Sequence, residues 1–291
     1  MAVDQGPVVQ SAILRAELVR LRKAKGLTQE QVASILDWSP SKLIRVEGGR
    51  SSVTKVDLDA LLTEYGVPAS SPEREQLQEM NRGARDRGWW NAYRDEISEP
   101  YLNYVGYEAG ATFIRQFLST VVPGLLQTRE YAEVLTASQA KPIEVAAVVN
   151  LRLQRASELT QRSTRPRQYY VLDEAVIRRR VGIKKEPAIM PNQLRYMADR
   201  AEEDDLITIR VIPFEEGAHA GLTTGPFTLL EFDGGLPDLL YLDVGRGESA
   251  STTGNDPQVS EYADTFESLV DASLSKEESI AYLRNAAEEM S

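Results

Sequence analysis

Two short runs of apolar residues lie close together in residues 26–50, GLTQEQVASILDWSPSKLIRVEGGR. Residues three and four positions apart share one face of a helix, so each run predicts a short amphipathic helix. The pattern therefore predicts two short helices that share one core. The apolar positions are Val32, Ala33, Ile35 and Leu36 in the first run, and Leu43, Ile44 and Val46 in the second.

The ends of these two helices have sequence signals of their own. Thr28 is a predicted N-cap, and Gln31, three residues later, is its predicted capping-box partner. Ser39 is a predicted N-cap of the second helix, and Pro40 fits the first turn. The pair Gly48–Gly49 marks the end of that helix. The segment is therefore predicted to form a helix, a tight turn and a second helix.

The exposed face of the second helix is predicted to carry Ser41, Lys42 and Arg45. A plain helical hairpin with a solvated basic face would also explain these residues. The turn signals and the local charge favour a helix-turn-helix that reads DNA.

The segment resembles the XRE family, regulators of the phage-repressor and Cro type, and follows the family pattern L-T-Q-x-x-x-A-x-x-L-x-x-S-x-x-x-I-x-x-x-E-x-G closely. The resemblance covers about residues 10–68. It implies that the second helix enters the major groove and that the Gln at the start of the first helix holds the phosphate backbone. By position, Gln29 would hold phosphate. The base-facing residues would be Ser41, Lys42 and Arg45.

One position departs from the family pattern. Pro40 stands where many members place a polar, base-reading side chain. More of the reading would then fall to Lys42 and Arg45, which can donate to guanine O6 and N7. Glu47 is predicted to be a structural carboxylate that hydrogen-bonds within the domain. The full set of predicted DNA-binding residues is Thr28, Gln29, Ser39, Ser41, Lys42, Arg45, Arg50 and Lys55.

Charge is distributed unevenly along the chain. The net charge is −11, but residues 10–55 hold nine Lys and Arg against four acidic residues, a local charge of +5. Such a basic face supplies sequence-independent attraction to phosphates. From residue 199 onward, five basic residues stand against 21 acidic residues, a charge of −16 that would keep this end away from DNA.

Residues 141–190 are again basic, with eleven Lys and Arg against five acidic residues. Three uses are open: contact with DNA that flanks the operator, pairing with the acidic region after residue 199, or binding of an acidic partner protein. Internal pairing is favoured because that acidic region is the nearest counter-charge.

A chain of 291 residues is long enough for two domains. Helices are expected at 11–25 and 54–65, so residues 1–68 are assigned to a helix-turn-helix DNA-binding domain. Residues 69–87 are expected to form a hinge and an exposed, charged connector helix. Residues 88–291 are expected to form a domain that senses a signal or binds a partner and also mediates dimerisation.

The sequence contains no run of 18 or more apolar residues and no signal peptide, so we expect a cytoplasmic protein without a membrane span. It contains no cysteine, which excludes disulfides, thiolate metal sites and regulation by thiol oxidation. We expect neither a metal nor a cofactor.

Aromatic residues are concentrated in the stretch 88–136. Most of them are expected to build the core of the second domain, and the alternative is a ligand pocket or a partner groove. A turn at Pro123 leads into a helix for which Thr128 is a possible N-cap, and this structural role explains the segment equally well. The candidate ligand- or partner-binding residues are Trp89, Trp90, Tyr93, Gln127 and Arg129.

Scattered motifs in the rest of the chain carry a second resemblance. They include W-W-x-x-Y from residue 89, P-G-L-L-Q-T-x-x-Y-A from residue 123 and Y-x-V-L-D-E-A-x-I-R-R-x-V-G from residue 169, with further matches to about residue 244. They resemble the actinobacterial antitoxin-like regulators, which include WhiJ-like developmental regulators. The resemblance implies an XRE helix-turn-helix joined to a large C-terminal domain, often encoded beside a small partner protein.

Strand signals occur only in the later part of the chain, and helical signals alternate with them. Strands are expected at 168–173, 207–212, 227–232 and 239–243, and helices at 143–162, 174–181, 190–203, 258–272 and 276–289. The Gly/Ser/Thr-rich segment 245–257 is expected to be a mobile loop. The predicted fold is an all-α helix-turn-helix DNA-binding domain followed by a larger α+β domain with a small, mainly antiparallel sheet.

A catalytic role for the second domain is the weaker alternative. His219 is the only histidine and there is no cysteine, so a histidine-rich metal site and a cysteine nucleophile are both unavailable. The adjacent pairs Asp173–Glu174 and Glu202–Glu203 are explained by a solvated helix face. His219 is expected to be an ordinary polar loop residue. We therefore expect no enzymatic activity.

Together these features predict a sequence-specific DNA-binding transcriptional regulator that reads double-stranded DNA. A single helix-turn-helix reads too few base pairs for genomic specificity, so a homodimer on two half-sites is expected. The regulator would be controlled, through its C-terminal domain, by a small-molecule effector or by a small protein encoded nearby. The alternative is an antitoxin-like interaction protein that restrains a small cognate partner and autoregulates its own operon.

Overall fold

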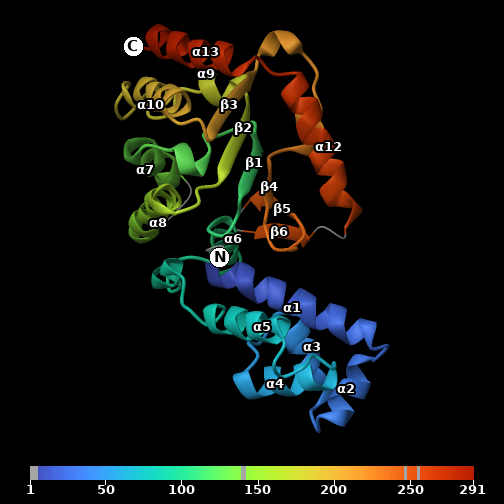
Figure 1. Cartoon of the computed structure of the whole chain (residues 1–291). Coiled ribbons are helices and arrows are strands. Elements are labelled where there is room, and N and C mark those ends of the chain that lie inside the picture. Colours follow the sequence, from blue (N-terminus) through green and yellow to red (C-terminus); the bar gives the residue numbers. More distant parts are fainter. Residues whose placement is uncertain (1–5, 139–141, 246–247, 254–255) are drawn as a thin grey trace. The chain divides into compact units, whose positions relative to one another are not determined.

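The chain divides into two compact units, seen here in a computed structural model that describes residues 6–138, 142–245, 248–253 and 256–291. The smaller unit consists of Met1–Trp89 with Asp233–Leu236, and the larger unit of Trp90–Phe232 with Pro237–Ser291 (Figure 1). No helix within the described ranges is long and apolar enough to cross a membrane.

From Gly6 onward, where the structure describes it, the smaller unit contains five α-helices, which confirms that this region is all-α. They are α1 Gly6–Ala24, α2 Gln29–Ile35, α3 Pro40–Glu47, α4 Lys55–Glu64 and α5 Pro72–Gly83. Their core contains the fully buried side chains of Val32, Leu43 and Leu58, from α2, α3 and α4. α1 begins at Gly6, earlier than the predicted start at residue 11.

The predicted capping signals hold at most helix ends. Thr28 Oγ1 accepts from the Gln31 backbone N–H at 3.2 Å, and the Gln31 side chain accepts from the Thr28 N–H at 2.8 Å, so the capping box is confirmed. Ser39 occupies the N-cap position of α3, but its hydroxyl makes no capping hydrogen bond and lies 3.2 Å from Ser41 Oγ. Gly48 follows the last residue of α3, as predicted.

A tight turn joins α2 to α3. Asp37 adopts a φ of 54°, and it is the only non-glycine residue with a positive φ among those that the structure describes. Residues other than glycine rarely adopt this left-handed backbone conformation, because their Cβ atom comes too close to the backbone. The Trp38 N–H then donates to the Ala33 carbonyl at 2.8 Å and closes the turn.

Two residues that we predicted for the shared core are exposed instead. Ile35 of α2 is 52% exposed and Ile44 of α3 is 45% exposed. Each helix is only about two turns long, and a face one or two residues wide is sufficient to cover its side of the core. Val32 and Ala33 supply that face in α2, whereas Leu36 is only half-buried.

The connector helix predicted within residues 69–87 packs into the smaller unit. Leu77 of α5 is buried in its core, and α5 contacts α1. Arg74 is also buried, and its guanidinium donates to the backbone carbonyls of Val67 at 3.0 Å and Asp59 at 2.9 Å. We predicted an exposed helix from its polar composition, and that composition did not reveal the face that packs. Arginine can be buried when backbone carbonyls accept its hydrogen bonds.

A largely buried ion pair joins α1 to α3, with the side chains of Arg22 and Glu47 11% and 4% exposed. Arg22 Nε donates to Glu47 Oε1 at 2.7 Å and Arg22 Nη2 donates to Glu47 Oε2 at 2.9 Å. The hydrogen bonds that Arg22 donates to the Glu47 carboxylate raise the pKa of Arg22. The prediction that Glu47 is a structural carboxylate is therefore confirmed.

A second ion pair joins α3 to α4. Lys42 Nζ donates to Asp57 Oδ1 at 2.7 Å and lies 3.8 Å from the centre of the Trp38 ring. Partial burial alone would raise the pKa of Asp57, but the hydrogen bonds from Lys42 and Thr54 outweigh it and lower that pKa below its usual value of 3.8.

A six-stranded mixed sheet with the strand order β3-β2-β1-β4-β5-β6 forms the centre of the larger unit. β1 pairs parallel with β2, and β2 pairs parallel with β3; the other three pairings, β1 with β4, β4 with β5 and β5 with β6, are antiparallel. The strands are β1 Phe113–Leu118, β2 Arg167–Asp173, β3 Ile207–Ile212, β4 Phe227–Glu231, β5 Leu239–Gly245 and β6 Glu248–Thr253.

Helices lie on both faces of this sheet (Figure 1). The α-helices are α6 Glu99–Glu108, α7 Arg129–Ala137, α8 Pro142–Gln161, α9 Glu174–Arg178, α10 Ile189–Glu203, α11 Gly221–Thr224, α12 Pro257–Asp271 and α13 Lys276–Glu289. The short 3-10 helices are η1 Trp89–Tyr93, η2 Gly124–Leu126 and η3 Phe214–Glu216. Thr128 caps α7 by accepting from the Tyr131 N–H at 3.3 Å, as predicted.

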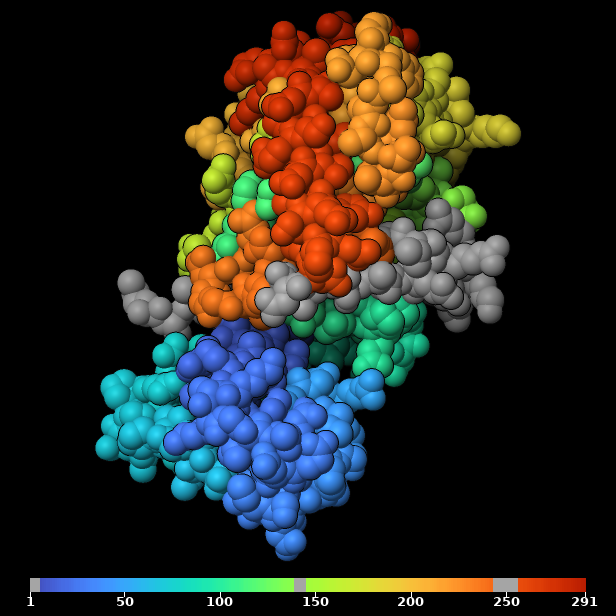
Figure 2. Space-filling view, turned by 90° about the vertical axis from the view of Figure 1, so that its right-hand side faces the viewer, coloured from blue at the N-terminus to red at the C-terminus, as the bar shows by residue number. Residues whose placement is uncertain are grey.

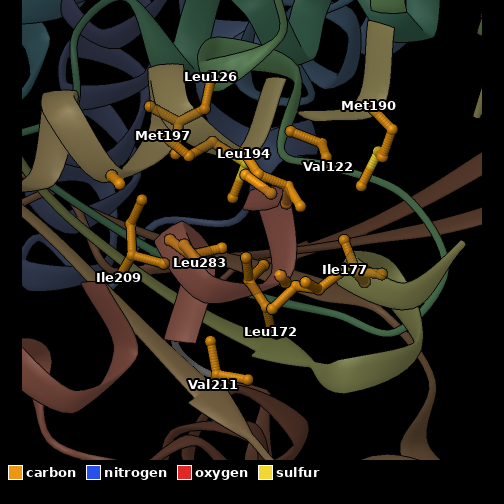
Figure 3. Packing of buried hydrophobic residues seen from close by; sticks show 14 of the residues in the cluster. Val122, Leu126, Leu172, Ile177, Met190, Leu194, Met197, Ile209, Val211 and Leu283 are labelled. Carbon is orange, nitrogen blue, oxygen red and sulfur yellow. The ribbon is translucent and has the colours of Figure 1, made fainter. Parts of the chain in front are cut away.

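Each face of the sheet has its own core. On one face Leu172, Ile209 and Val211 pack against Leu194 of α10 and Leu283 of α13 (Figure 3). The opposite face contributes a second set of buried residues that pack under α12, which is at the surface in Figure 2. The strands contribute Phe117, Val171 and Leu229 to that set, and Phe266 and Leu269 of α12 pack against them.

The α+β architecture is confirmed, and the four predicted strands correspond to β2, β3, β4 and β5. Two strands were not predicted. β1 was read as part of an aromatic core, and β6 lies within segment 245–257, which we predicted as a mobile loop; residues 246–247 and 254–255 of that segment are outside the described residues. Because β1 pairs parallel with β2, the sheet is mixed, although three of its five pairings are antiparallel.

Removal of a core side chain should destabilise the larger unit. Leu194 is fully buried, so Leu194→Ala should lower the free energy of unfolding by about 2–5 kcal/mol through lost contacts and a cavity. Leu222 is 62% exposed, so Leu222→Ala should change it little. Scanning calorimetry of the full chain measures both, and equal losses in the two variants would contradict the assigned core.

The Arg22–Glu47 pair should stabilise the smaller unit strongly. Glu47→Ala leaves the partly buried Arg22 without its carboxylate and should lower the free energy of unfolding by about 1–3 kcal/mol. The matched control is Glu17→Ala, since Glu17 pairs with exposed Arg20 at 2.6 Å and solvent screens that pair, so its removal should change the stability little. Urea unfolding measures both values, and a cost for Glu47→Ala no larger than that of the control would refute the structural role.

The Lys42–Asp57 pair should make stability depend on pH. The folded-state pKa of Asp57 is lowered, so its contribution is fully present above the unfolded pKa and is lost as pH falls through the folded pKa. The difference in stability between the wild type and Asp57→Asn should therefore be largest near neutral pH and shrink below the usual value of 3.8. Thermal unfolding across a pH series tests this, and a pH-independent difference would show that Asp57 contributes without its charge.

Candidate nucleic-acid interface

The packing of α3 determines which of its side chains reach solvent. Leu43 and Val46 are buried in the core of the smaller unit, and these positions fix the inward face of the helix. Ser41, Ile44 and Arg45 are exposed on the remainder of the surface. Of the three predicted base-facing residues, the structure therefore exposes Ser41 and Arg45 together, one helical turn apart.

Lys42, which we predicted to face the bases, is paired within the domain. Its side chain is 33% exposed and its ammonium group is paired with Asp57 of α4. Sequence spacing places Lys42 on the same helix as Arg45, but the position of Asp57 depends on how α4 packs. Contact of Lys42 with a base or a phosphate would require it to leave Asp57.

The structure places Gln29 beside the buried ion pair. Gln29 is the first residue of α2, and its Nε2 donates to Glu47 Oε2 at 2.7 Å. Glu47 thus accepts from both Arg22 and Gln29, and it joins α1, α2 and α3 at one point. An amide group carries two N–H donors, so one remains after this contact.

The other predicted DNA contacts lie at the ends of helices. Thr28 and Ser39 are the exposed residues that precede α2 and α3. Arg50 follows α3 and Lys55 begins α4, and both side chains are exposed. Neither of them, nor Arg45, forms an ion pair with a described residue, so three basic side chains of this region have no acidic partner there.

Sequence reasoning missed Ile44 as a surface residue. Its side chain is 45% exposed, next to Arg45. An exposed aliphatic side chain on a groove-reading helix can contact the methyl group of thymine. The sequence alone could have indicated this exposure. In a helix of eight residues, Leu43 and Val46 are enough to form the buried face, so Ile44 need not be buried.

The five candidate ligand-binding residues of the second domain do not form one site. Trp89 and Trp90 fall on opposite sides of the boundary between the units. Tyr93 donates its hydroxyl to Gln154 at 2.9 Å. Arg129 is exposed on α7 and contacts Asn150 at 3.4 Å. Only Gln127 lines a cavity of the larger unit, which has a volume of about 550 Å³.

Asp173 and Glu174 are buried rather than solvated. Asp173 caps α9 by accepting from the Ala175 N–H at 2.7 Å, and its second oxygen lies 3.0 Å from His219 Nε2. Glu174 accepts from the Phe214 N–H at 2.7 Å. His219 is also buried, with a side chain 4% exposed, so it is a packed residue and not an ordinary loop residue.

The remaining acidic pair fits its prediction. Glu202 and Glu203 are exposed at the end of α10, and Glu202 pairs with Arg284 at 2.5 Å.

Two residues of the basic segment 141–190 pair with the acidic region, as the favoured interpretation expects. Arg165 pairs with Asp204, and Arg178 pairs with Glu289.

Comparisons with known proteins divide the chain in a similar way. A family model described as a helix-turn-helix domain matches residues 13–77, which supports a DNA-binding regulator. No curated protein and no solved structure matches the chain. A family model described as a domain of unknown function (DUF5753) matches residues 101–285, more than half of the chain. The chain belongs to the DUF5753 family.

Proposed function

We propose that this chain is a sequence-specific transcriptional regulator of the XRE and WhiJ-like type that reads an operator as a homodimer through α3. The observation that carries the proposal is the exposed face of α3, where Ser41, Ile44 and Arg45 stand opposite a buried face. A helix held in this way can enter the major groove without rearranging the core.

The three exposed residues supply different kinds of base contact. Arg45 can donate two hydrogen bonds to guanine O6 and N7, a contact worth about 1–3 kcal/mol of discrimination between bases. Ser41 can donate or accept, and Ile44 can contact a thymine methyl group. Arg45 therefore carries most of the specificity in this proposal.

Other residues of the smaller unit would fix its position on the duplex. The second amide N–H of Gln29 is available for a phosphate oxygen, while Glu47 holds the side chain in place. Arg50 and Lys55 add exposed positive charge. Lys42 has a lesser role, because it must exchange its 2.7 Å contact with Asp57 for any contact with DNA.

The larger unit would control DNA binding in response to a ligand or a small protein, and it would supply the dimer contacts. The need for a dimer follows from the short stretch of bases that one recognition helix reads. Two copies would place their α3 helices on half-sites about one helical turn apart.

The test is selection of genomic fragments bound by the full chain at near-physiological salt. Arg45→Ala should weaken binding to the selected operator by about 1–3 kcal/mol and relax the preference at particular positions. Lys42→Ala should have a smaller effect on specificity. Arg82→Ala removes the same charge from an exposed position on α5 and should leave the selected sequence unchanged.

Two results would overturn this reading of α3. An Arg45→Ala protein that selects the wild-type motif unchanged would show that another surface reads the bases. No enrichment by well-folded wild-type protein would reject autonomous operator recognition and favour the antitoxin-like alternative, in which binding requires a small cognate partner.

A further inference from the structure

The cavity of the larger unit is bounded by the sheet on one side. Its floor is formed by Gln116 of β1, Thr228 of β4 and Tyr241 of β5, which are neighbours across the strands. Gln116 Nε2 donates to Thr228 Oγ1 at 2.9 Å. The volume of about 550 Å³ is in the range of sites that bind small organic molecules.

Aromatic side chains line the cavity beside this polar floor. Tyr101 and Tyr104 come from α6, and their rings are stacked with centres 6.0 Å apart. The Tyr104 ring lies 4.1 Å from that of Tyr241. These three rings offer an apolar surface against which a flat or hydrocarbon body can pack.

One of the two arginines in the lining is already neutralised. Arg155 of α8 is buried, and it donates to both carboxylate oxygens of Glu108, at 2.8 Å and 2.5 Å. It also donates to the Tyr101 hydroxyl at 2.5 Å. Burial and the Glu108 charge raise the pKa of Tyr104 well above its usual value, so its hydroxyl stays protonated and donates to Glu108 at 2.9 Å. This cluster carries no net charge.

The second arginine has no such counter-charge. Arg152, one turn before Arg155, donates through Nη1 to Thr136 Oγ1 at 3.0 Å and to Gln127 Oε1 at 3.3 Å. Both acceptors are neutral, and no carboxylate of a described residue lies within ion-pair distance of Arg152. Among the described residues of the lining, Glu96 is the only acidic one, and its side chain is exposed.

We propose that the cavity binds a small organic anion whose charged group pairs with Arg152 and whose apolar body packs on the tyrosines. A carboxylate, sulfonate or phosphate ester could accept hydrogen bonds from the N–H groups of the Arg152 guanidinium that no protein acceptor uses. The polar floor of Gln116 and Thr228 orients the molecule, and the tyrosine rings favour ligands with an apolar body. Among the positively charged side chains of the lining, Arg152 is the one available for the anion.

A fluorescent probe of this chemistry tests the proposal on the full chain. The probe 8-anilinonaphthalene-1-sulfonate has an aromatic body and one sulfonate, and N-phenyl-1-naphthylamine is its uncharged counterpart. Wild-type protein should bind the sulfonate probe with one-to-one stoichiometry. Arg152→Gln should weaken that binding by about tenfold and leave the affinity for the uncharged probe within about twofold.

Two further variants separate the cavity from other surfaces. Arg129→Gln removes an equal charge from the exposed surface of α7 and should not change the affinity for either probe. Gly124 lines the cavity, and a Cβ atom there would meet only ordinary contact with Arg155 at 3.5 Å. Gly124→Leu should therefore fill space and weaken the binding of both probes without disrupting the fold.

Each contrary outcome would overturn the proposal. These are no saturable binding of the sulfonate probe, equal affinity of wild type and Arg152→Gln for it, and insensitivity of both probes to Gly124→Leu. Calorimetry of each variant shows whether it is folded. This control is needed because a loosened protein would also bind the probes, although not with one-to-one stoichiometry.

The anion site depends on the proposed function in one respect only, namely that the bound anion would regulate DNA binding. Probe binding is measured without DNA, and the fragment selection is measured without the probe. If the selection fails and the probe results hold, the anion site stands and the regulator hypothesis falls; the reverse combination rejects the anion site alone.

Discussion

The larger unit depends on β1, which has a different strand partner on each edge and different packing on each face. On its edges it pairs parallel with β2 and antiparallel with β4, so it joins the two halves of the sheet. On one face Phe117 is packed under α12, and on the other Gln116 borders a cavity while Leu118 enters a second core. A single strand thus separates a densely filled layer from one that retains space for a small molecule.

Buried bidentate arginine–glutamate pairs support both candidate sites. Arg22 and Glu47 join α1 to α3, while Arg155 and Glu108 join α8 to α6. Burying such ions is costly unless their geometry and additional hydrogen bonds satisfy them, and both pairs have such bonds. In each unit, an arginine without an acidic partner among the described residues lies on the same helix as one member of the pair: Arg45 with Glu47 on α3, and Arg152 with Arg155 on α8.

The features that depend on neighbours in sequence could be predicted, and those that depend on distant residues could not. The caps at Thr28 and Thr128 and the four apolar strands are local signals, and the structure contains them. β1 was missed because Gln116 and its neighbour Arg115 interrupt its apolar run; the partner of Gln116 lies 112 residues away. In α3, spacing identified the exposed Arg45, but only packing of α4 could show that Lys42 is paired.

The turn between α2 and α3 is held by the packing around it. Asp37 adopts a backbone conformation that its own side chain disfavours, and glycine would adopt it freely. The helices on either side are too short to be stable alone. The angle between them is therefore imposed from outside the motif, by the core and by the contact of Glu47 with α1. A piece of this chain that holds α3 at this angle to α2 must therefore include the other helices that share the core, and residues 26–50 in isolation would be an unstructured peptide.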